Sequence, residues 1–186
     1  MSRQPLAVAL VHHPVLDKRG DLVTTAVTNL DLHDIARSAA TFGVTRFYVV
    51  TPVVEQQKLT ARLVAHWTEG HGARYNPDRA EALGRVEVVA TLEEALQHWQ
   101  QELGAESQVW LTGAKCHDGL KLSAARDSLE EQAALLVLGT GWGLAPQLFE
   151  RGWQVLRAIR GAGNYNHLPV RAAAAIMFER LCGETV

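Results

Sequence analysis

The order of apolar and amphipathic stretches constrains the fold of this chain more than any other feature. Apolar runs with the length and the β-branched or aromatic content of strands cover residues 6–11, 46–50, 86–90, 109–113, 134–139 and, more weakly, 155–159. Several are apolar at every position, which is typical of parallel strands that helices cover on both faces. Because helix-like stretches separate the runs, we predict a three-layer α/β fold with a mainly parallel sheet, formed by residues 1–186 as one domain.

The stretches between the runs have the spacing of amphipathic helices. Residues 30–43 place apolar side chains near one face and end at a glycine, which favours a helix C-terminus. Residues 56–67 and 91–103 are also amphipathic, and Thr91 is expected to cap the second of these helices. The segment 69–85 is polar and contains glycine, so we expect a surface excursion there.

Composition excludes several classes of protein. With 47% hydrophobic residues in a chain of 186, a folded globular protein is expected rather than a disordered one. The net charge of -2 and the pI near 6.4 argue against a surface that coats nucleic acid broadly, but they allow a local basic patch. No apolar run approaches the roughly 20 residues of a membrane span, the start does not resemble a signal peptide, and two cysteines are too few for a disulfide framework. These features favour a cytoplasmic protein.

Three segments rich in glycine or small polar residues each follow a predicted strand. They are "TGAKCHDG" (112–119), "GTGWGLAP" (139–146) and "RGAGNYNHLP" (160–169). In parallel α/β sheets, ligands bind outside the carboxyl ends of the strands. Glycines let a ligand approach the backbone closely, although they also simply make turns. Three such segments at one edge of the sheet favour a ligand pocket.

The residue types in these segments narrow the choice of ligand. The spacing of Gly139, Gly141 and Gly143 is not the G-x-G-x-x-G of dinucleotide sites, and no acidic residue follows at the required distance. The chain lacks a Walker A sequence, G-x-S-x-G, H-E-x-x-H and paired C-x-x-C, and its eight histidines have no metal-ligand spacing. We therefore expect a backbone-lined pocket without a metal, suited to a ligand such as an adenosine.

Both ends of the chain carry a resemblance to a known family. "LVLGTGWGL" followed by "GAGNYNHLPVRAAAAI" resembles the cofactor-binding end of the SPOUT class of S-adenosylmethionine-dependent RNA methyltransferases. The start "LVHHPVLDKRGDLVTTAVTNLDLHDIARSAATFGV" resembles that of a small bacterial family of predicted RNA methyltransferases in this class. The resemblance implies a trefoil knot in the C-terminal third, S-adenosylmethionine in the knot loops, a tRNA or rRNA substrate, and a homodimer.

The resemblance also assigns roles to residues. Arg37 matches the arginine of the first motif and is expected to act on the RNA, with Asp31 or Asp34 as its partner or as a base. Lys18, Arg19 and Lys115 are candidates for RNA contacts because of their charge. The residues expected to contact S-adenosylmethionine lie in or beside the three glycine-bearing segments: Thr112, Gly113, Ala114, Leu138, Gly139, Thr140, Gly141, Gly143, Leu144, Ile159, Gly161, Gly163, Asn164, Asn166, His167 and Leu168.

Two motifs depart from the family pattern. Related tRNA ribose methyltransferases carry a glutamate in the second motif, where this chain reads "LVLGTGWGL". In the third motif, Pro169 and Arg171 occupy the positions of an asparagine and a serine. Methylation of a base and of a ribose therefore both stay open, as does a non-catalytic protein that binds RNA or adenosine. Asn166 has an alternative role as a cap of the last helix.

The last predicted helix, residues 168–181, is apolar almost all round. A helix that packs on a sheet normally buries one stripe and exposes the rest. The apolar surface is therefore either buried inside the chain or covered by a second copy. Together with the family resemblance, this favours a homodimer through the helix.

Overall fold

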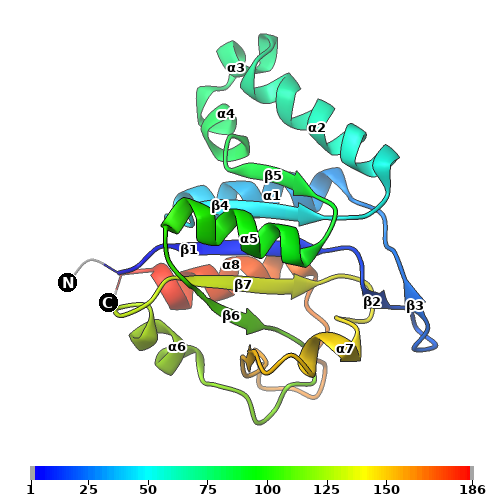
Figure 1. Cartoon of the computed structure of the whole chain (residues 1–186), viewed down its shortest axis with the longest axis vertical. Helices are drawn as coiled ribbons and strands as arrows, with labels where there is room; N and C mark the ends of the chain where they lie inside the picture. Colours follow the sequence, from blue (N-terminus) through cyan, green and yellow to red (C-terminus); the bar gives the residue numbers. More distant parts are fainter. Residues whose placement is uncertain (1–2, 185–186) are drawn as a thin grey trace.

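The fold is described from a computed structural model, of which residues 3–184 are considered (Figure 1). Its strands are β1 (Leu6–Val11), β2 (Val15–Leu16), β3 (Leu22–Val23), β4 (Arg46–Val50), β5 (Val86–Val89), β6 (Gln108–Leu111), β7 (Ala134–Gly139) and β8 (Gln154–Val155). Its helices are α1 (Asn29–Thr41), α2 (Val54–Thr68), α3 (His71–Tyr75), α4 (Pro77–Leu83), α5 (Leu92–Leu103), α6 (Leu122–Ser128), α7 (Pro146–Phe149) and α8 (Val170–Cys182).

Six strands form one sheet in the order β5-β4-β1-β7-β6-β8, and every neighbouring pair is parallel. The five stronger strand predictions are confirmed to within two residues at either end. The weaker run at 155–159 contributes only to β8, which is two residues long at the edge of the sheet. The remaining strands, β2 and β3, form a separate antiparallel hairpin within the long connection that precedes α1.

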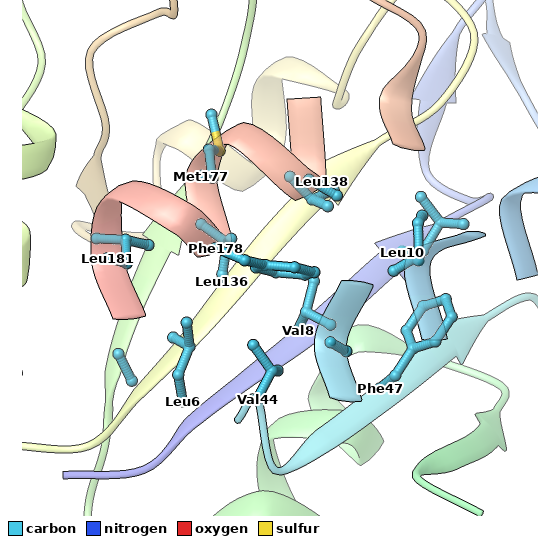
Figure 2. Close-up of a cluster of buried hydrophobic side chains, with 14 of the residues drawn as sticks. Leu6, Val8, Leu10, Val44, Phe47, Leu136, Leu138, Met177, Phe178 and Leu181 are labelled. Carbon is cyan, nitrogen blue, oxygen red and sulfur yellow. The ribbon is translucent and has the colours of Figure 1, made fainter. Parts of the chain in front are cut away.

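Helices cover both faces of the sheet, which confirms the predicted three layers. Alternate residues of β1 belong to two different cores: Leu6, Val8 and Leu10 to one, and Ala7, Ala9 and Val11 to the other. Buried residues of α1, α4, α6 and α8 complete the first core, and those of α5 and α7 complete the second. Figure 2 shows Met177 and Phe178 of α8 above Leu136 of β7 in the first core.

Two of the three predicted helices begin at side-chain caps. Thr28 precedes α1, and its hydroxyl accepts a hydrogen bond from the Asp31 N–H at 3.1 Å. Thr91 caps α5 as predicted, accepting from the Glu94 N–H, and the Glu94 carboxylate accepts from the Ala90 N–H at 2.8 Å. The helices predicted at 30–43, 56–67 and 91–103 are confirmed as α1, α2 and α5.

The segment 69–85, which was expected to be a surface excursion, contains two helices that the sequence analysis did not predict. The segment forms α3 and α4, and α4 packs against α1 and α2 through buried Ala82 and Leu83. Asn76 caps α4 and Pro77 occupies its first turn, two local signals that a helix begins there. Helices of five and seven residues are too short to show a clear apolar period.

The last helix differs from its prediction at the start. It begins at Val170, and Leu168 lies before it with 44% of its surface exposed. Asn166 does not cap it, because its N-cap residue is Pro169, and no side chain bonds there. Within residues 3–184, no helix is long and apolar enough to cross a bilayer. The trefoil knot stays a prediction.

We expect the short helix α4 to be part of the cooperative core. Leu83 is fully buried, so Leu83→Ala should lower the free energy of unfolding by about 2–5 kcal/mol through the cavity it leaves. Tyr75 in α3 is 79% exposed, so Tyr75→Ala should change the free energy of unfolding by less than about 0.5 kcal/mol. Urea denaturation of both variants measures this. Equal effects of the two substitutions would mean that α4 is not part of the core.

Candidate active site

The three glycine-bearing segments meet at one edge of the sheet. They follow β7, β6 and β8, which are neighbouring parallel strands. Hydrogen bonds join the segment 112–119 to the chain after β8: the Asn166 side-chain amide donates to the Ala114 carbonyl at 2.9 Å, and the Ala158 N–H donates to the Cys116 carbonyl at 2.8 Å. The structure thus brings together the segments that the sequence predicted to form a ligand site.

Protein atoms, rather than open space, surround two of the three glycines after β7. A Cβ atom at Gly139 would lie 2.8 Å from the backbone nitrogen of Leu144, and one at Gly141 would lie 2.8 Å from the Leu16 carbonyl oxygen. Gly141 and Gly143 have positive φ angles of 59° and 112°, which favour glycine. The glycines are therefore required by the turn and by the approach of β2, and not only by a ligand.

The β2–β3 hairpin is joined to this turn by backbone hydrogen bonds. The Trp142 N–H donates to the Leu16 carbonyl, and the Leu16 N–H donates to the Gly143 carbonyl, both at 2.9 Å. The Ala145 N–H donates to the Pro14 carbonyl at 3.1 Å. The long connection after β1 thus forms one wall of the candidate site.

The predicted cofactor contacts differ in what they offer a ligand. Leu138 and Leu144 are buried, 2% and 5% exposed, in separate cores on opposite faces of the sheet. Thr112 is also buried, and its hydroxyl donates a hydrogen bond to the Val137 carbonyl at 2.9 Å. At Thr112, Leu138 and Leu144, a ligand would therefore meet mainly backbone atoms. Ile159 is half-buried against the first core. Of the predicted cofactor contacts in the last segment, Gly161, Gly163, Asn164, His167 and Leu168 are exposed.

An ion-pair cluster joins the beginnings of α1 and α8. Asp31, whose side chain is 13% exposed, accepts from the Arg171 guanidinium at 3.3 Å and from the Thr28 hydroxyl at 2.7 Å. The Arg171 Nε also lies 3.4 Å from Asp34. The arginine at an unexpected position of the third motif thus binds the first motif. The sequence analysis assigned no role to Arg171. The signal available in the sequence was that an arginine stands where the third motif has a serine.

Arg37 lies apart from this cluster. It is exposed, and within residues 3–184 no carboxylate forms an ion pair with it. It borders an open groove of about 450 Å³ between α1 and α8, called here the α1–α8 groove. The groove is lined by Asp34, Arg37, Ser38, Thr41, Phe42, Arg171, Ala172 and Ala175.

The three lysine and arginine candidates for RNA contacts are all exposed, but they are not equivalent. Arg19 is held by Asp17 at 3.3 Å and Asp21 at 3.1 Å within the turn of the β2–β3 hairpin. Backbone N–H groups of this turn, first that of Asp21, lower the pKa of Asp17, so its charge is retained beside Arg19. Lys18 and Lys115 have no ion pair within the part of the chain that the structure describes.

Sequence reasoning also missed His12, a fully buried histidine at the carboxyl end of β1. Its Nδ1 lies 3.0 Å from the Thr25 hydroxyl. Burial lowers the His12 pKa to about 4, an effect that the nearby Asp31 charge partly offsets, so the ring is neutral near pH 7. The signal in the sequence was its place directly after an apolar strand, where polar side chains reach the site edge.

Comparison with known proteins decides the family. Residues 5–183 match a family described as SAM-dependent RNA methyltransferase. This chain belongs to that family. A tRNA (guanine-N(1)-)-methyltransferase of Nitratidesulfovibrio vulgaris (strain Hildenborough) is 46% identical over 179 residues, which are 96% of this chain but 42% of that protein. An uncharacterized protein of Aquifex aeolicus is 34% identical over 97% of this chain and 90% of its own length.

A solved methyltransferase structure shares the fold of this chain. The SpoU methyltransferase AviRb from Streptomyces viridochromogenes, solved in complex with AdoMet (S-adenosylmethionine), superposes with a TM-score of 0.59 at 14% identity. The match covers 98% of this chain and 58% of AviRb. The fold is therefore that of the SPOUT methyltransferases, as the sequence resemblance implied. Within residues 3–184, no group of three His, Cys, Asp or Glu side chains is arranged to hold a metal ion.

We expect His12 to make this protein less stable in acid. Its pKa is about 4 in the folded chain and about 6.5 when unfolded, so the unfolded state binds the proton more readily. The stabilisation is complete above pH 6.5 and decreases as the pH falls to 4. Asparagine does not titrate, so the His12→Asn variant should lack this decrease. The difference in free energy of unfolding between wild type and variant should therefore shrink by about 3 kcal/mol between pH 7 and pH 4. Urea denaturation across this range measures the difference, and a constant difference would contradict a buried neutral histidine.

Proposed function

We propose that the chain transfers a methyl group from S-adenosylmethionine to a nucleotide of RNA at the edge formed by β7, β6 and β8. The observation that carries this proposal is the convergence of three backbone-rich segments beside the Asp31–Arg171 pair. Membership of the SAM-dependent RNA methyltransferase family supports the same donor. The sulfonium group of this donor supplies an already activated methyl group, so the protein has mainly to orient donor and acceptor.

The cofactor site in this proposal consists of residues 112–114, 138–144 and 159–168. Backbone of the first two segments faces the ligand, because the side chains of Thr112, Leu138 and Leu144 are buried in the protein. Asn166 holds the third segment against the first through the Ala114 carbonyl. Such a site recognises shape and hydrogen-bonding edges, which suits an adenosine moiety better than a charged phosphate.

The residues that act on the RNA in this proposal lie on α1. Arg37 is exposed and has no ion pair within residues 3–184, so its planar guanidinium is available for a phosphate. Asp31 is held by Arg171 and Thr28, which fixes its carboxylate near the last segment of the cofactor site. There it would accept a proton from the acceptor nucleotide. Lys18 and Lys115 extend the basic surface.

The RNA substrate that we propose is based on the names of related proteins. The Nitratidesulfovibrio protein is named for a guanine in tRNA, and this chain spans 42% of its length. We propose tRNA, and a guanine base in it, as the first substrate to test, with rRNA as the second. A cytoplasmic location, where these RNAs are found, is part of the proposal.

A homodimer through α8 is a further part of the proposal. One stripe of α8, formed by Ala174, Met177, Phe178 and Leu181, is buried inside the chain. Ala172 and Ala175 instead line the α1–α8 groove, where their small side chains let another helix approach closely. A second copy of the chain in this groove would cover Phe42, Ala172 and Ala175 and lie beside Arg37.

We expect wild-type protein to bind S-adenosylmethionine and S-adenosylhomocysteine in calorimetry, but not NAD. With tritiated S-adenosylmethionine and RNA from cells that lack the protein, wild type should label RNA. Arg37→Ala should keep cofactor affinity within about threefold and lose at least about tenfold in transfer, because a charge-assisted phosphate contact is removed. Arg74→Ala, on the distant helix α3, is the matched control and should behave as wild type. Cofactor binding without any labelling of RNA would instead support a non-catalytic binding protein.

Sedimentation equilibrium at micromolar concentration should give about twice the chain mass of 20.4 kDa. Ala175→Arg should yield a monomer, since it places a third cation beside Arg37 and Arg171 in the α1–α8 groove. Gln147→Arg adds the same charge to α7, on the opposite face of the sheet, and should stay dimeric. A wild-type monomer would contradict the dimer, and a dimeric Ala175→Arg would place the interface elsewhere.

A further inference from the structure

Four polar groups from distant parts of the chain form a continuous row beneath the candidate site. The His12 Nδ1 lies 3.0 Å from the Thr25 hydroxyl oxygen. That oxygen lies 2.5 Å from the Thr140 hydroxyl oxygen, which in turn lies 3.0 Å from the Val11 carbonyl oxygen. The row connects the end of β1, the segment before α1 and the glycine-bearing turn after β7.

Counting protons fixes the direction of every hydrogen bond in this row. The Val11 carbonyl can only accept, so Thr140 uses its single hydroxyl proton there. Thr25 must therefore donate to Thr140, and its oxygen is left to accept from His12. His12 consequently carries its proton on Nδ1. Its Nε2 is a lone-pair acceptor with no hydrogen-bond partner among residues 3–184.

The row ties together the two sides of the proposed reaction. Thr140 belongs to the turn that lines the cofactor site, between Gly139 and Gly141. Thr25 precedes the α1 cap Thr28 by three residues, and Thr28 bonds to Asp31. The Thr25 N–H also donates to the His12 carbonyl at 2.9 Å, so this segment is fixed to β1 by backbone as well as side chain.

We propose that His12 and Thr25 are positioning residues that hold the α1 side of the site, with Asp31, in register with the cofactor turn at Thr140. This rests on the proposed function, because it assumes that the turn binds the donor and that α1 faces the RNA. Neither residue touches a ligand. Their effect is on the alignment of donor and acceptor, to which methyl transfer is sensitive.

The first test separates the hydroxyl of Thr25 from its shape. Thr25→Val keeps the shape and removes the hydroxyl, whereas Thr25→Ser keeps the hydroxyl. Thr24→Val is the matched control, since the exposed Thr24 hydroxyl contacts His13 instead, at 3.1 Å. Calorimetry gives the dissociation constant for S-adenosylmethionine, and tritium transfer to RNA from cells lacking the protein gives the rate at saturating donor.

Thr25→Val should lower the transfer rate about tenfold, as expected for the loss of a buried hydrogen bond, while the dissociation constant changes less than about threefold. Thr25→Ser and Thr24→Val should both retain the rate of wild type within about threefold. A Thr25→Val enzyme at the wild-type rate, or a Thr25→Ser enzyme as slow as Thr25→Val, would overturn the proposal. A wild type that binds the donor but transfers no methyl group would overturn the proposed function itself.

The second test detects the hydrogen bonds of this row by NMR spectroscopy and does not depend on methyl-transfer activity. Long-range proton–nitrogen correlation spectra of the whole protein, with imidazole nitrogens labelled, should show His12 protonated on Nδ1 and not on Nε2 at pH 7. Thr25→Val removes the acceptor of this proton and should shift the His12 Nδ1 resonance or change the tautomer, whereas Thr25→Ser should not. A His12 protonated on Nε2 in wild type would overturn the proposal, whatever the transfer rates show.

Discussion

The pairing of β1 with β7 is the interaction on which the rest of the structure depends. Six residues of each strand run side by side in parallel, from Leu6 opposite Ala134 to Val11 opposite Gly139. This register places the end of the first strand directly beside the start of the glycine-bearing turn. Hairpin β2–β3 can then bond to that turn, and Thr25 can reach Thr140. Without the pairing, the long connection after β1 would not meet the glycine-bearing turn, and the wall that it forms would be lost.

The strands and longer helices could be predicted because their patterns are simple. The central strands β1 and β7 are buried on both faces and apolar throughout, and α1 and α5 repeat apolar residues over three turns. The same reasoning missed α3 and α4, because helices of five and seven residues are too short to show an apolar period, and α4 instead packs onto α1 and α2 with Ala82 and Leu83 buried. Tertiary contacts of this kind leave little trace in the local sequence.

The sequence predicted the edge of the sheet at which the candidate site lies, but not the contacts between the segments that form it. Glycine in the turn after β7 was interpreted as room for a ligand, whereas the structure fills the space beside Gly139 and Gly141 with Leu144 and Leu16. Arg171 could not be matched to Asp31, nor Thr140 to Thr25, because each pair joins segments far apart in the chain. Residue spacing predicts contacts within one helix or strand, whereas these contacts depend on how different helices, strands and turns are arranged in space.

The central position of β1 has a consequence for the newly made protein on the ribosome. One edge of β1 is covered by β4, which is synthesised shortly afterwards, but the other edge awaits β7, which comes after β5, α5, β6 and α6. Until then the apolar segment "LAVALV" presents unpaired N–H and carbonyl groups to its surroundings. Such an edge readily pairs with other chains. Production of this protein should therefore depend on chaperones that shield the growing chain, and faster translation of the region up to β7 should reduce aggregation.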